Sequence, residues 1–529
     1  MDSGTLTPQA LAGRRLFLIA QLDIAGVTIY AATDELAIPW AATLKTVAVA
    51  RYLSRPIEVT LSAGYGEPQN EPGAATFEMP ILGPLADLHR AGVLTRSPGR
   101  AVVFAWIEGA DYDDREILVS GPVRVAAAGA LGEAMIITVQ QDDGRVSAMF
   151  PPLGAVLDDS PASVGGADVQ EDAVGTPYPF PFGRPPLVSG SGANPPATSP
   201  AIPLALTSGG DVAVLVCAGG LVEAAQVDVF DKDGAQDSLT LDYRADGRGQ
   251  TFARLILGSM YAGPLNVTDG APYVCRWTNG RGQLHDGQAI DGAGQLIELL
   301  LRASGRDYDA ARTAGARAQL DVYKVAGCID EPVIALDYIG DALAAVLPFT
   351  LTSGPRGFWP WPWPLNPQVS AALVILDTSE PGVSRASELS VSTAGMINEA
   401  RVSYSIDRQT GEARRSFTVS GSGSGADLEL AQLDGSQRQH GVLAADLESV
   451  VLYDPATASR ALNALLSVKG QPAERVTYDL APGFAWLRPR AVVKIVDPDL
   501  ALEAVALVDR LTLSENAVTA ELVILRRLV

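Results

Sequence analysis

The sequence predicts a mainly β protein with some α-helix (α+β), in which two antiparallel β-domains flank a mixed α/β middle region. The apolar residues are mostly Ala, Val and Leu in short runs, and 52 Gly and 36 Pro are spread along the chain. This punctuation favours many short strands over long helices. At 529 residues the chain also exceeds what one hydrophobic core usually holds, which predicts several domains.

The N-terminal β-domain is expected at residues 1–150, and its first 13 residues are expected to be a loose leader. Residues 55–62 alternate between apolar and polar side chains, as in a half-buried strand. We expect the first three strands to pair with one another and one amphipathic helix to cover the domain, at residues 84–94. The strands predicted from such runs are 16–22, 27–31, 55–62, 101–107, 116–121, 123–127 and 135–139. A barrel or a sandwich accommodates this set.

Residues 151–205 form a predicted linker or strap rich in Pro, Gly and Ser. In residues 177–186 prolines alternate with other residues, so the backbone lacks the N–H groups that a central strand needs. Two interpretations stay open: an extended strap packed on its own protein or a neighbouring subunit, and a recognition motif for an aromatic-lined groove.

The middle region, residues 206–385, is predicted to mix strands and helices. Helical spacing of leucine and isoleucine indicates a buried stripe on residues 294–304. The other expected elements are helices at 309–320 and 338–347 and strands at 212–217, 226–230, 238–243 and 251–257. Residues 358–364 place Trp359, Trp361 and Trp363 among prolines. This loop either anchors itself to a sheet or the next subunit, or offers an aromatic lip to a carbohydrate or a partner.

The C-terminal β-domain is expected at residues 386–529. It begins with a half-buried strand at 396–406, and a polar turn follows at 436–441. Asp454 and Pro455 suit the N-cap and first turn of a helix over 455–466. Four further antiparallel strands are predicted at 475–480, 491–496, 504–508 and 517–525.

Charge and cysteine usage exclude several classes of protein. A net charge of −22 argues against a surface that grips nucleic acid, which requires clustered Lys and Arg. Cys217, Cys275 and Cys328 are far apart and lack C-x-x-C spacing, so buried thiols are expected rather than disulfides or a zinc site. No apolar run reaches the length of a membrane span, and we expect synthesis in a host cytoplasm.

The sequence offers no convincing catalytic, cofactor or metal site. The three histidines, His89, His285 and His440, fall in different predicted domains, and no G-x-S-x-G elbow accompanies them. The calcium-like segment at residues 228–234 lacks carboxylates at the required positions, and no phosphate-binding loop occurs. We therefore expect no catalytic residue, no cofactor and no metal, and we expect that Asn266 is not a glycosylation site.

One acidic cluster admits an enzymatic interpretation. Asp111, Asp113, Asp114 and Glu116 could supply the two carboxylates of a glycosidase. The simpler interpretation is the solvated tip of a hairpin between two strands.

The order of elements in the C-terminal region resembles the baseplate hub proteins of long-tailed bacteriophages and gene transfer agents. Residues 397–404 resemble their N-x-V-x-V-x-Y strand, and residues 436–441 resemble the S-x-x-x-x-G turn that follows it. The helix at 455–466 and the strand at 489–496 come in the same order, although the family often has Gly-Asp where this chain has Arg490-Ala491. Fainter matches lie at residues 55–142, 117–121, 294–308 and 337–347, so the resemblance covers roughly two thirds of the chain.

This resemblance implies a structural virion protein without enzymatic activity, located at the tail tip or baseplate. Such hubs carry two tube-like β-domains per chain, so that a homotrimer adapts the sixfold tail tube to a threefold tip and forms part of the DNA ejection channel. The implied partners are the distal tail and tube proteins, tip or fibre proteins, the tape measure protein in the lumen, and DNA in transit. The alternatives are a β-rich polysaccharide-degrading enzyme and a carbohydrate-binding attachment module, with Trp359, Trp361 and Trp363 as sugar platforms.

Overall fold

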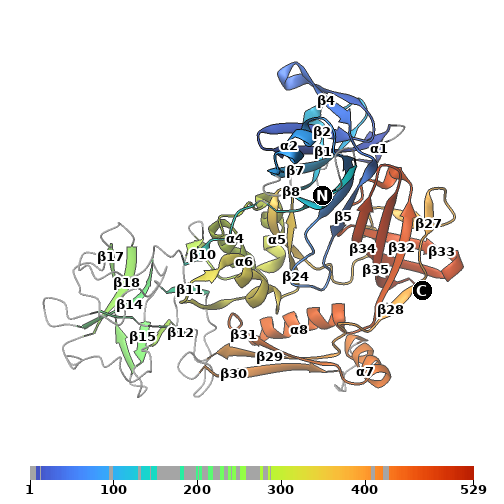
Figure 1. Ribbon diagram of the computed structural model, residues 1–529. Coiled ribbons are helices and arrows are strands. Elements are labelled where there is room, and N and C mark those ends of the chain that lie inside the picture. Colours follow the sequence, from blue (N-terminus) through green and yellow to red (C-terminus); the bar gives the residue numbers. More distant parts are fainter. Residues whose placement is uncertain are drawn as a thin grey trace.

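The computed structural model describes nine continuous segments and, between residues 198 and 285, a set of short strands. The segments are residues 7–11, 14–93, 99–128, 133–142, 144–151, 179–183, 288–406, 411–420 and 428–528, with Gly144 following a one-residue gap. Strands are the commonest element in these parts, as Figure 1 shows. The prediction of a mainly β protein with some helix is confirmed.

One sheet of 16 strands dominates the molecule and combines the two ends of the chain. Its order is β27-β32-β35-β34-β5-β6-β9-β8-β7-β1-β2-β4-β3, with β26, β28 and β33 paired off this path. The N-terminal strands are β1 (Leu16–Ile24), β2 (Val27–Ala32), β3 (Leu36–Trp40), β4 (Lys45–Arg51), β5 (Arg55–Ser62), β6 (Ala74–Pro80), β7 (Arg100–Ile107), β8 (Glu116–Ala128) and β9 (Ala134–Gln140). The C-terminal strands are β26 (Ile375–Asp377), β27 (Val383–Arg385), β28 (Ser390–Ser392), β32 (Ala473–Leu480), β33 (Val492–Asp497), β34 (Leu502–Leu513) and β35 (Val518–Arg527).

The junction between these two sets is the antiparallel pairing of β5 with β34. It runs from Ser62 opposite Arg510 to Val59 opposite Leu513. Val59 and Leu511 are fully buried in a single core that also includes Leu18 and Tyr478. In Figure 1 the blue and red parts of the ribbon accordingly lie side by side.

Short helical segments complete this first core. Helix α1 (Pro8–Leu11) buries Leu11, and α2 (Pro84–Arg90) buries Leu85 beneath its exposed polar face. Single 3-10 turns lie between strands, at η1 (Ala41–Thr43), η2 (Tyr112–Asp114), η8 (Pro482–Phe484) and η9 (Pro498–Leu500).

A second core forms between the middle region and the first half of the predicted C-terminal domain. It joins Leu296, Leu300 and Phe349 to Val402 and Leu462. The helices are α4 (Ala293–Ala303), α5 (Ala310–Leu320), α6 (Ala335–Tyr338), the π-helical turn η6 (Ile339–Ala344), α7 (Leu428–His440) and α8 (Pro455–Lys469). The strands are the hairpin β24 (Phe349–Gly354) and β25 (Gly357–Pro362) and the three-stranded sheet β30 (Ala413–Ser420), β29 (Glu399–Ile406) and β31 (Ala444–Ser449).

The remaining strands make small sheets, several of which Figure 1 shows at its left. Two four-stranded sheets have the orders β12-β19-β15-β16 and β13-β14-β18-β17. Their bounds are β12 (Thr198–Pro200), β13 (Ile202–Leu204), β14 (Val212–Ala218), β15 (Val227–Phe230), β16 (Gln236–Leu239), β17 (Leu241–Ala245), β18 (Thr251–Leu257) and β19 (Val274–Trp277). The two-stranded pairs are β10 (Met149–Phe150) with β23 (Val333–Ile334), β11 (Phe180–Gly183) with β22 (Ala326–Ile329), and β20 (Leu284–His285) with β21 (Gln288–Ala289). A last 3-10 turn, η7 (Val369–Ala371), precedes β26.

Most predicted elements are present near their expected bounds. The helices expected at 294–304, 309–320 and 455–466 correspond to α4, α5 and α8, and Asp454 caps α8 by accepting hydrogen bonds from the backbone N–H groups of Ala456 and Thr457. Within the Pro-rich strap only 179–183 are described among residues 177–186. There β11 pairs antiparallel with β22, and Phe182 is fully buried.

Five predictions are corrected. The third expected strand, β5, does not pair with β1 or β2 but with β6 and β34. The two strands expected at 116–121 and 123–127 form one strand, β8, which pairs with β7 up to Pro122 and with β9 from Val123 onward. The expected turn at 436–441 is mostly the end of helix α7, which stops at His440 before Gly441, whose φ is +77°.

The other two corrections concern the middle region. The helix expected at 338–347 begins earlier, as α6, and continues as the π-helical turn η6. The Pro/Trp segment is not a loop but strand β25. Its prolines are tolerated because, among the described strands, β25 pairs along its length only with β24, and its other edge has an isolated bridge from Phe358 to Tyr308.

The expected domain boundaries stay predictions, and the packing adds one fact about them. Residues 396–466 contribute to the second core, whereas residues 473–524 contribute to the first. The last 140 or so residues are therefore shared between two cores.

Candidate functional site

The three histidines, none of which is expected to be catalytic, lie on separate elements. His89 is in the last turn of α2, and His440 ends α7. His285 is on β20, and its side chain lies outside the described parts, as do the side chains of Cys217 and Cys275 and the segment with Asn266. Cys328 is buried on β22, as expected of a buried thiol.

The acidic cluster forms the tip between β7 and β8, as the simpler interpretation expects. The carboxylate of Asp111 caps η2 and accepts hydrogen bonds from the backbone N–H groups of Asp113 and Ala41. These bonds lower the pKa of the Asp111 carboxyl, whereas a glycosidase acid needs a raised pKa. Glu116 is paired with Arg488, whose Nε lies 2.9 Å from Glu116 Oε1. The cluster therefore has a structural explanation in capping and pairing.

The tryptophans proposed as sugar platforms are mostly covered. Trp359 and Trp363 are only 5% and 6% exposed, and Trp361 is partly buried. The Trp363 indole N–H donates to Thr350 Oγ1 over 2.9 Å, and both Trp361 and Trp363 lie against Tyr65. These rings anchor the hairpin to the rest of the protein, so the interpretation as a stacking surface is wrong for Trp359 and Trp363.

The loop at residues 63–70 connects the two cores. On one side, the Ala63 N–H donates to the Asp509 carbonyl over 2.6 Å. On the other, Thr350 Oγ1 donates to the carbonyls of Gly64 and Glu67, and Leu351 N–H donates to Pro68 O. The loop thus links β34 of the first core to β24 of the second.

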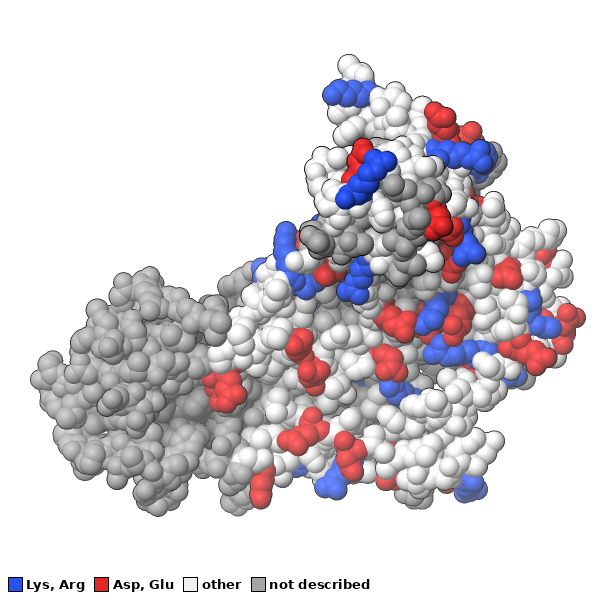
Figure 2. All heavy atoms as spheres, viewed as in Figure 1, with Lys and Arg blue, Asp and Glu red and all other residues white. Residues whose placement is uncertain are grey.

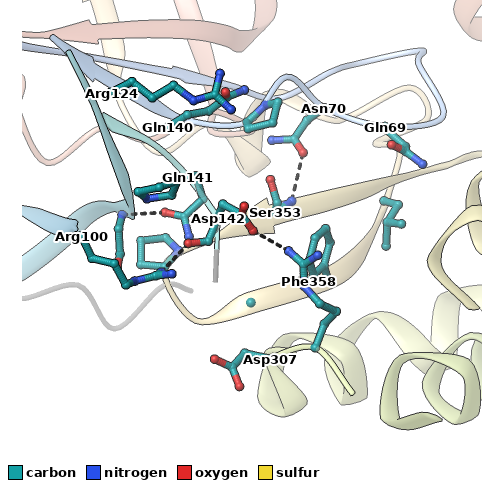
Figure 3. Close-up of a pocket in the computed structure, with 18 residues that line it drawn as sticks. Gln69, Asn70, Arg100, Arg124, Gln140, Gln141, Asp142, Asp307, Ser353 and Phe358 are labelled. Carbon is teal, nitrogen blue, oxygen red and sulfur yellow. Dashed lines mark hydrogen bonds and ion pairs between the residues drawn. The ribbon is translucent and has the colours of Figure 1, made fainter. Parts of the chain in front are cut away.

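A polar cavity of about 500 Å³ lies beside this loop, where the N-terminal strands meet the β24–β25 hairpin (Figure 3). Arg306 Nη2 donates to Asp142 Oδ1 over 2.8 Å, and Arg100 Nη2 donates to the Asp142 carbonyl over 2.6 Å. Asn70 Oδ1 accepts from the Ser353 N–H over 2.9 Å. These groups bind one another across the cavity, so its geometry is that of a joint between the two cores.

The residues of this cavity do not form a nucleophile–base pair or a metal site. It is lined by Gln69, Asn70, Pro72, Arg100, Ser120, Pro122, Arg124, Gln140, Gln141, Asp142, Arg306, Asp307, Leu351, Ser353, Gly354, Pro355, Gly357 and Phe358. No His or Cys is among them. Across the described parts of the chain, no three His, Cys, Asp or Glu side chains are gathered as metal ligands would be.

A different kind of site is the three-stranded sheet, whose two outer strands carry opposite charges. β29 is central, β30 is antiparallel to it, and β31 is parallel to it. Arg414 is exposed on β30, and Asp446 and Glu448 are exposed on β31. Among the described strands, β30 and β31 pair only with β29, so each has one edge without a strand partner.

The charges on the rest of the visible face are mixed. Figure 2 shows Lys and Arg interspersed with Asp and Glu over the described surface. In the same parts of the chain, no helix is long and apolar enough to cross a membrane.

Comparison with known proteins gives remote structural similarities. No protein-family model matches the chain, and no curated protein does. Solved structures that it resembles include phage tail and baseplate proteins. The 43 kDa tail protein of prophage MuSo2 from Shewanella oneidensis has a TM-score of 0.38 at 10% identity, covering 96% of this chain and 98% of that one. The tail protein of Neisseria meningitidis MC58 has a TM-score of 0.38 at 8% identity, covering 96% of each chain. A native gene transfer agent virion also matches, with a TM-score of 0.17, 12% identity and coverage of 52% of this chain and 81% of that one.

The charged strand edges were not among the sites that sequence reasoning proposed. The signal was present: Ala413-Arg414-Arg415 and Asp446-Leu447-Glu448 are short segments of opposite charge. Their significance depends on both strands flanking β29, which no local pattern specifies because β31 follows a helix and pairs in parallel.

Proposed function

We propose that this protein is a structural component of a phage or gene transfer agent tail, a homotrimeric hub at the tail tip without enzymatic activity. The observation that carries this proposal is the three-stranded sheet with a basic edge on β30 and an acidic edge on β31. The order of elements that resembles the baseplate hub proteins supports it independently.

The two edges are suited to pair between copies. β30 and β31 run in opposite directions relative to β29, so β30 of one copy would meet β31 of the next as an antiparallel pair. A register with Arg414 opposite Glu448 also sets Ser416 opposite Asp446 and keeps the alternation of the two faces. β30 and β31 have eight and six residues, which is enough for this ladder.

This contact would be heterologous, because one edge binds the other edge and not itself. Heterologous contacts form a ring when the rotation between neighbours closes. Pairing would also cover two unpaired edges that otherwise invite aggregation. A threefold ring of this kind would give each copy two equivalent neighbours.

In the assembled tail, two tube-like β-domains per chain would adapt a sixfold tube to a threefold tip, with tube, tip or fibre and tape measure proteins as neighbours. DNA would pass through the centre. A surplus of 22 negative charges suits such a passage, since an acidic lumen repels phosphates and lets the genome slide.

Charge reversal tests the contact in the full chain. Arg414→Glu and Glu448→Arg each place like charges across the ladder and should weaken association, by about 1 kcal/mol at each interface. The double variant restores an opposite-charge pair and should recover the trimer. Arg51→Glu, at the exposed end of β4, is the matched control and should associate as the original protein does. Sedimentation velocity gives the mass of each species.

Imaging of native particles tests the same proposal without purification of the subunit. Three copies arranged as a closed ring at the tail tip are expected, with β30 and β31 in contact. A different number of copies, or β30 and β31 both facing solvent, would refute the hub and its interface. A monomer that degrades glycans would instead support the enzymatic alternative.

A further inference from the structure

A second cavity, of about 260 Å³, lies next to the polar cavity described above and is rich in arginine. Its lining includes five arginines and one acidic residue, Glu116, in a protein with 39 Lys and Arg against 61 Asp and Glu. The arginines are Arg115, Arg312, Arg356, Arg488 and Arg490. They come from the β7–β8 tip, from α5, from the β24–β25 turn, and from the segment before β33.

Two of these arginines flank one aromatic ring. The guanidinium carbon of Arg312 lies 4.3 Å from the centroid of the Trp359 ring, and that of Arg490 lies 4.9 Å from it. The face of an aromatic ring attracts cations, so the Trp359 ring stabilises both guanidinium groups. Two positive charges are therefore held beside one buried ring.

Arg490 is held there in an unfavourable backbone conformation. Its φ is +78°, in the left-handed region that glycine favours, while its N–H donates to the Val508 carbonyl over 2.7 Å. This backbone conformation is unfavourable for any residue other than glycine. A glycine would adopt this backbone conformation more easily, yet the chain has an arginine at this position beside the cavity.

The turn that carries Arg356 is also constrained. Gly357 has a φ of +102°, and a Cβ on it would lie 2.0 Å from the Asp307 carbonyl oxygen. A Cβ on Gly354 would lie 2.8 Å from the Trp359 ring. These two glycines bring the exposed Arg356 to the rim of the cavity.

Some of the positive charge is already compensated. Glu116 binds Arg488, and Asp309 Oδ2 lies 3.5 Å from Arg312 Nε. Arg115 donates to the Tyr112 carbonyl, and Asp113 lies 3.7 Å from it. These three contacts hold Arg488, Arg312 and Arg115 in place around the cavity.

We propose that this arginine cavity binds a compact polyvalent oxyanion. Guanidinium groups present planar pairs of N–H donors that match phosphate and carboxylate oxygens. The volume lies below the 300–1,000 Å³ of typical ligand pockets, so it suits a small anion rather than a nucleotide. The bound anion would connect segments of both cores, and this inference does not depend on the assembly proposal.

Titration calorimetry of the full chain with inorganic pyrophosphate and, separately, with citrate tests the site at constant ionic strength. Binding of one molecule per chain is expected. A tighter response to pyrophosphate assigns phosphate chemistry, and a tighter response to citrate assigns carboxylate chemistry. Absence of saturable binding of both anions overturns the proposal.

Variants locate the site. Arg356 is exposed, so Arg356→Gln should leave the fold intact. It should raise the dissociation constant by about tenfold, the effect of one lost charge-assisted hydrogen bond. Arg312→Gln should weaken it similarly. Arg51→Gln, far from the cavity on β4, is the control and should leave the dissociation constant unchanged. If Arg356→Gln binds both anions as tightly as the original chain, the site is not this cavity.

Discussion

At the scale of residues, the sequence predicts capping and burial better than it predicts the purpose of single charged groups. Asp454 is recognisable as an N-cap because the proline and the apolar repeat that follow it specify a helix start. Arg490 carries no such signal. Its left-handed backbone depends on the tertiary hydrogen bond to Val508 on β34, which no local pattern encodes.

Tyr478 provides a pH prediction at this scale. It is fully buried and donates to Asp497 Oδ2 over 3.1 Å, and burial, with a smaller contribution from Asp497, raises the pKa of its hydroxyl. A raised folded-state pKa gives stability that is complete below the unfolded pKa of about 10 and is lost as pH rises above it. At pH 11 ionisation of this tyrosine in the unfolded chain should therefore lower the free energy of unfolding by about 1.4 kcal/mol.

Urea unfolding at pH 7, 9 and 11 checks this effect. Tyr478→Phe should be less stable at pH 7, because Asp497 loses a donor, by about 1–3 kcal/mol. Between pH 9 and 11 it should lose less stability than the original protein. The variant should still lose some stability at high pH, because burial also raises the pKa values of Tyr65 and Tyr112. Equal losses in the two proteins would contradict this role of Tyr478.

At the scale of elements, strands and helices follow from local patterns, whereas their partners do not. Residues 55–62 alternate as a strand should, and β5 is where that pattern places it. Its neighbours β6 and β34 come from residues 74–80 and 502–513, and sequence distance favours only the first. The turn expected at 436–441 fails for a related reason: α7 has no clear apolar stripe, and its helical state depends on contacts such as the buried Leu433.

Because β5 pairs with β34, a destabilising substitution near one end of the chain should also destabilise the strands near the other end. Leu511 is fully buried opposite Leu61 of β5, so Leu511→Ala should cost about 2–5 kcal/mol. Hydrogen exchange should accelerate in β5 and β6 as well as in β34 and β35. Leu462→Ala on α8, also buried but in the second core, is the matched control. Acceleration confined to residues 473–527 in Leu511→Ala would show that the two ends are energetically separate.

At the scale of the whole molecule, composition predicts class and charge but not the division of the cores. The middle region and residues 396–466 share one core through side chains such as Leu300 and Val402, which lie far apart in the sequence. A loop of eight residues, 63–70, then ties this core to the large sheet. The polar cavity and the arginine cavity both lie at that contact. Neither could be predicted from the sequence, because each is lined by residues on strands of both cores.

The whole-molecule charge predicts weak contact with DNA. A protein with 22 excess negative charges, mixed with its cations as Figure 2 shows, lacks a continuous basic surface on that face. At about 150 mM salt the full chain at about 10 μM should not retard duplex DNA in a gel. A complex that forms and weakens steeply with added salt would contradict this expectation.

The pairing of β5 with β34 also determines when folding can finish. Ser62 and Arg510 are partners in that ladder, so a ribosome must add more than 400 residues after β5 before its neighbour exists. At about 5–20 residues per second this interval lasts roughly 20–90 s. During translation the nascent chain therefore presents β5 with an unsatisfied edge, a natural binding target for chaperones, and the sheet closes only when the polypeptide is almost complete.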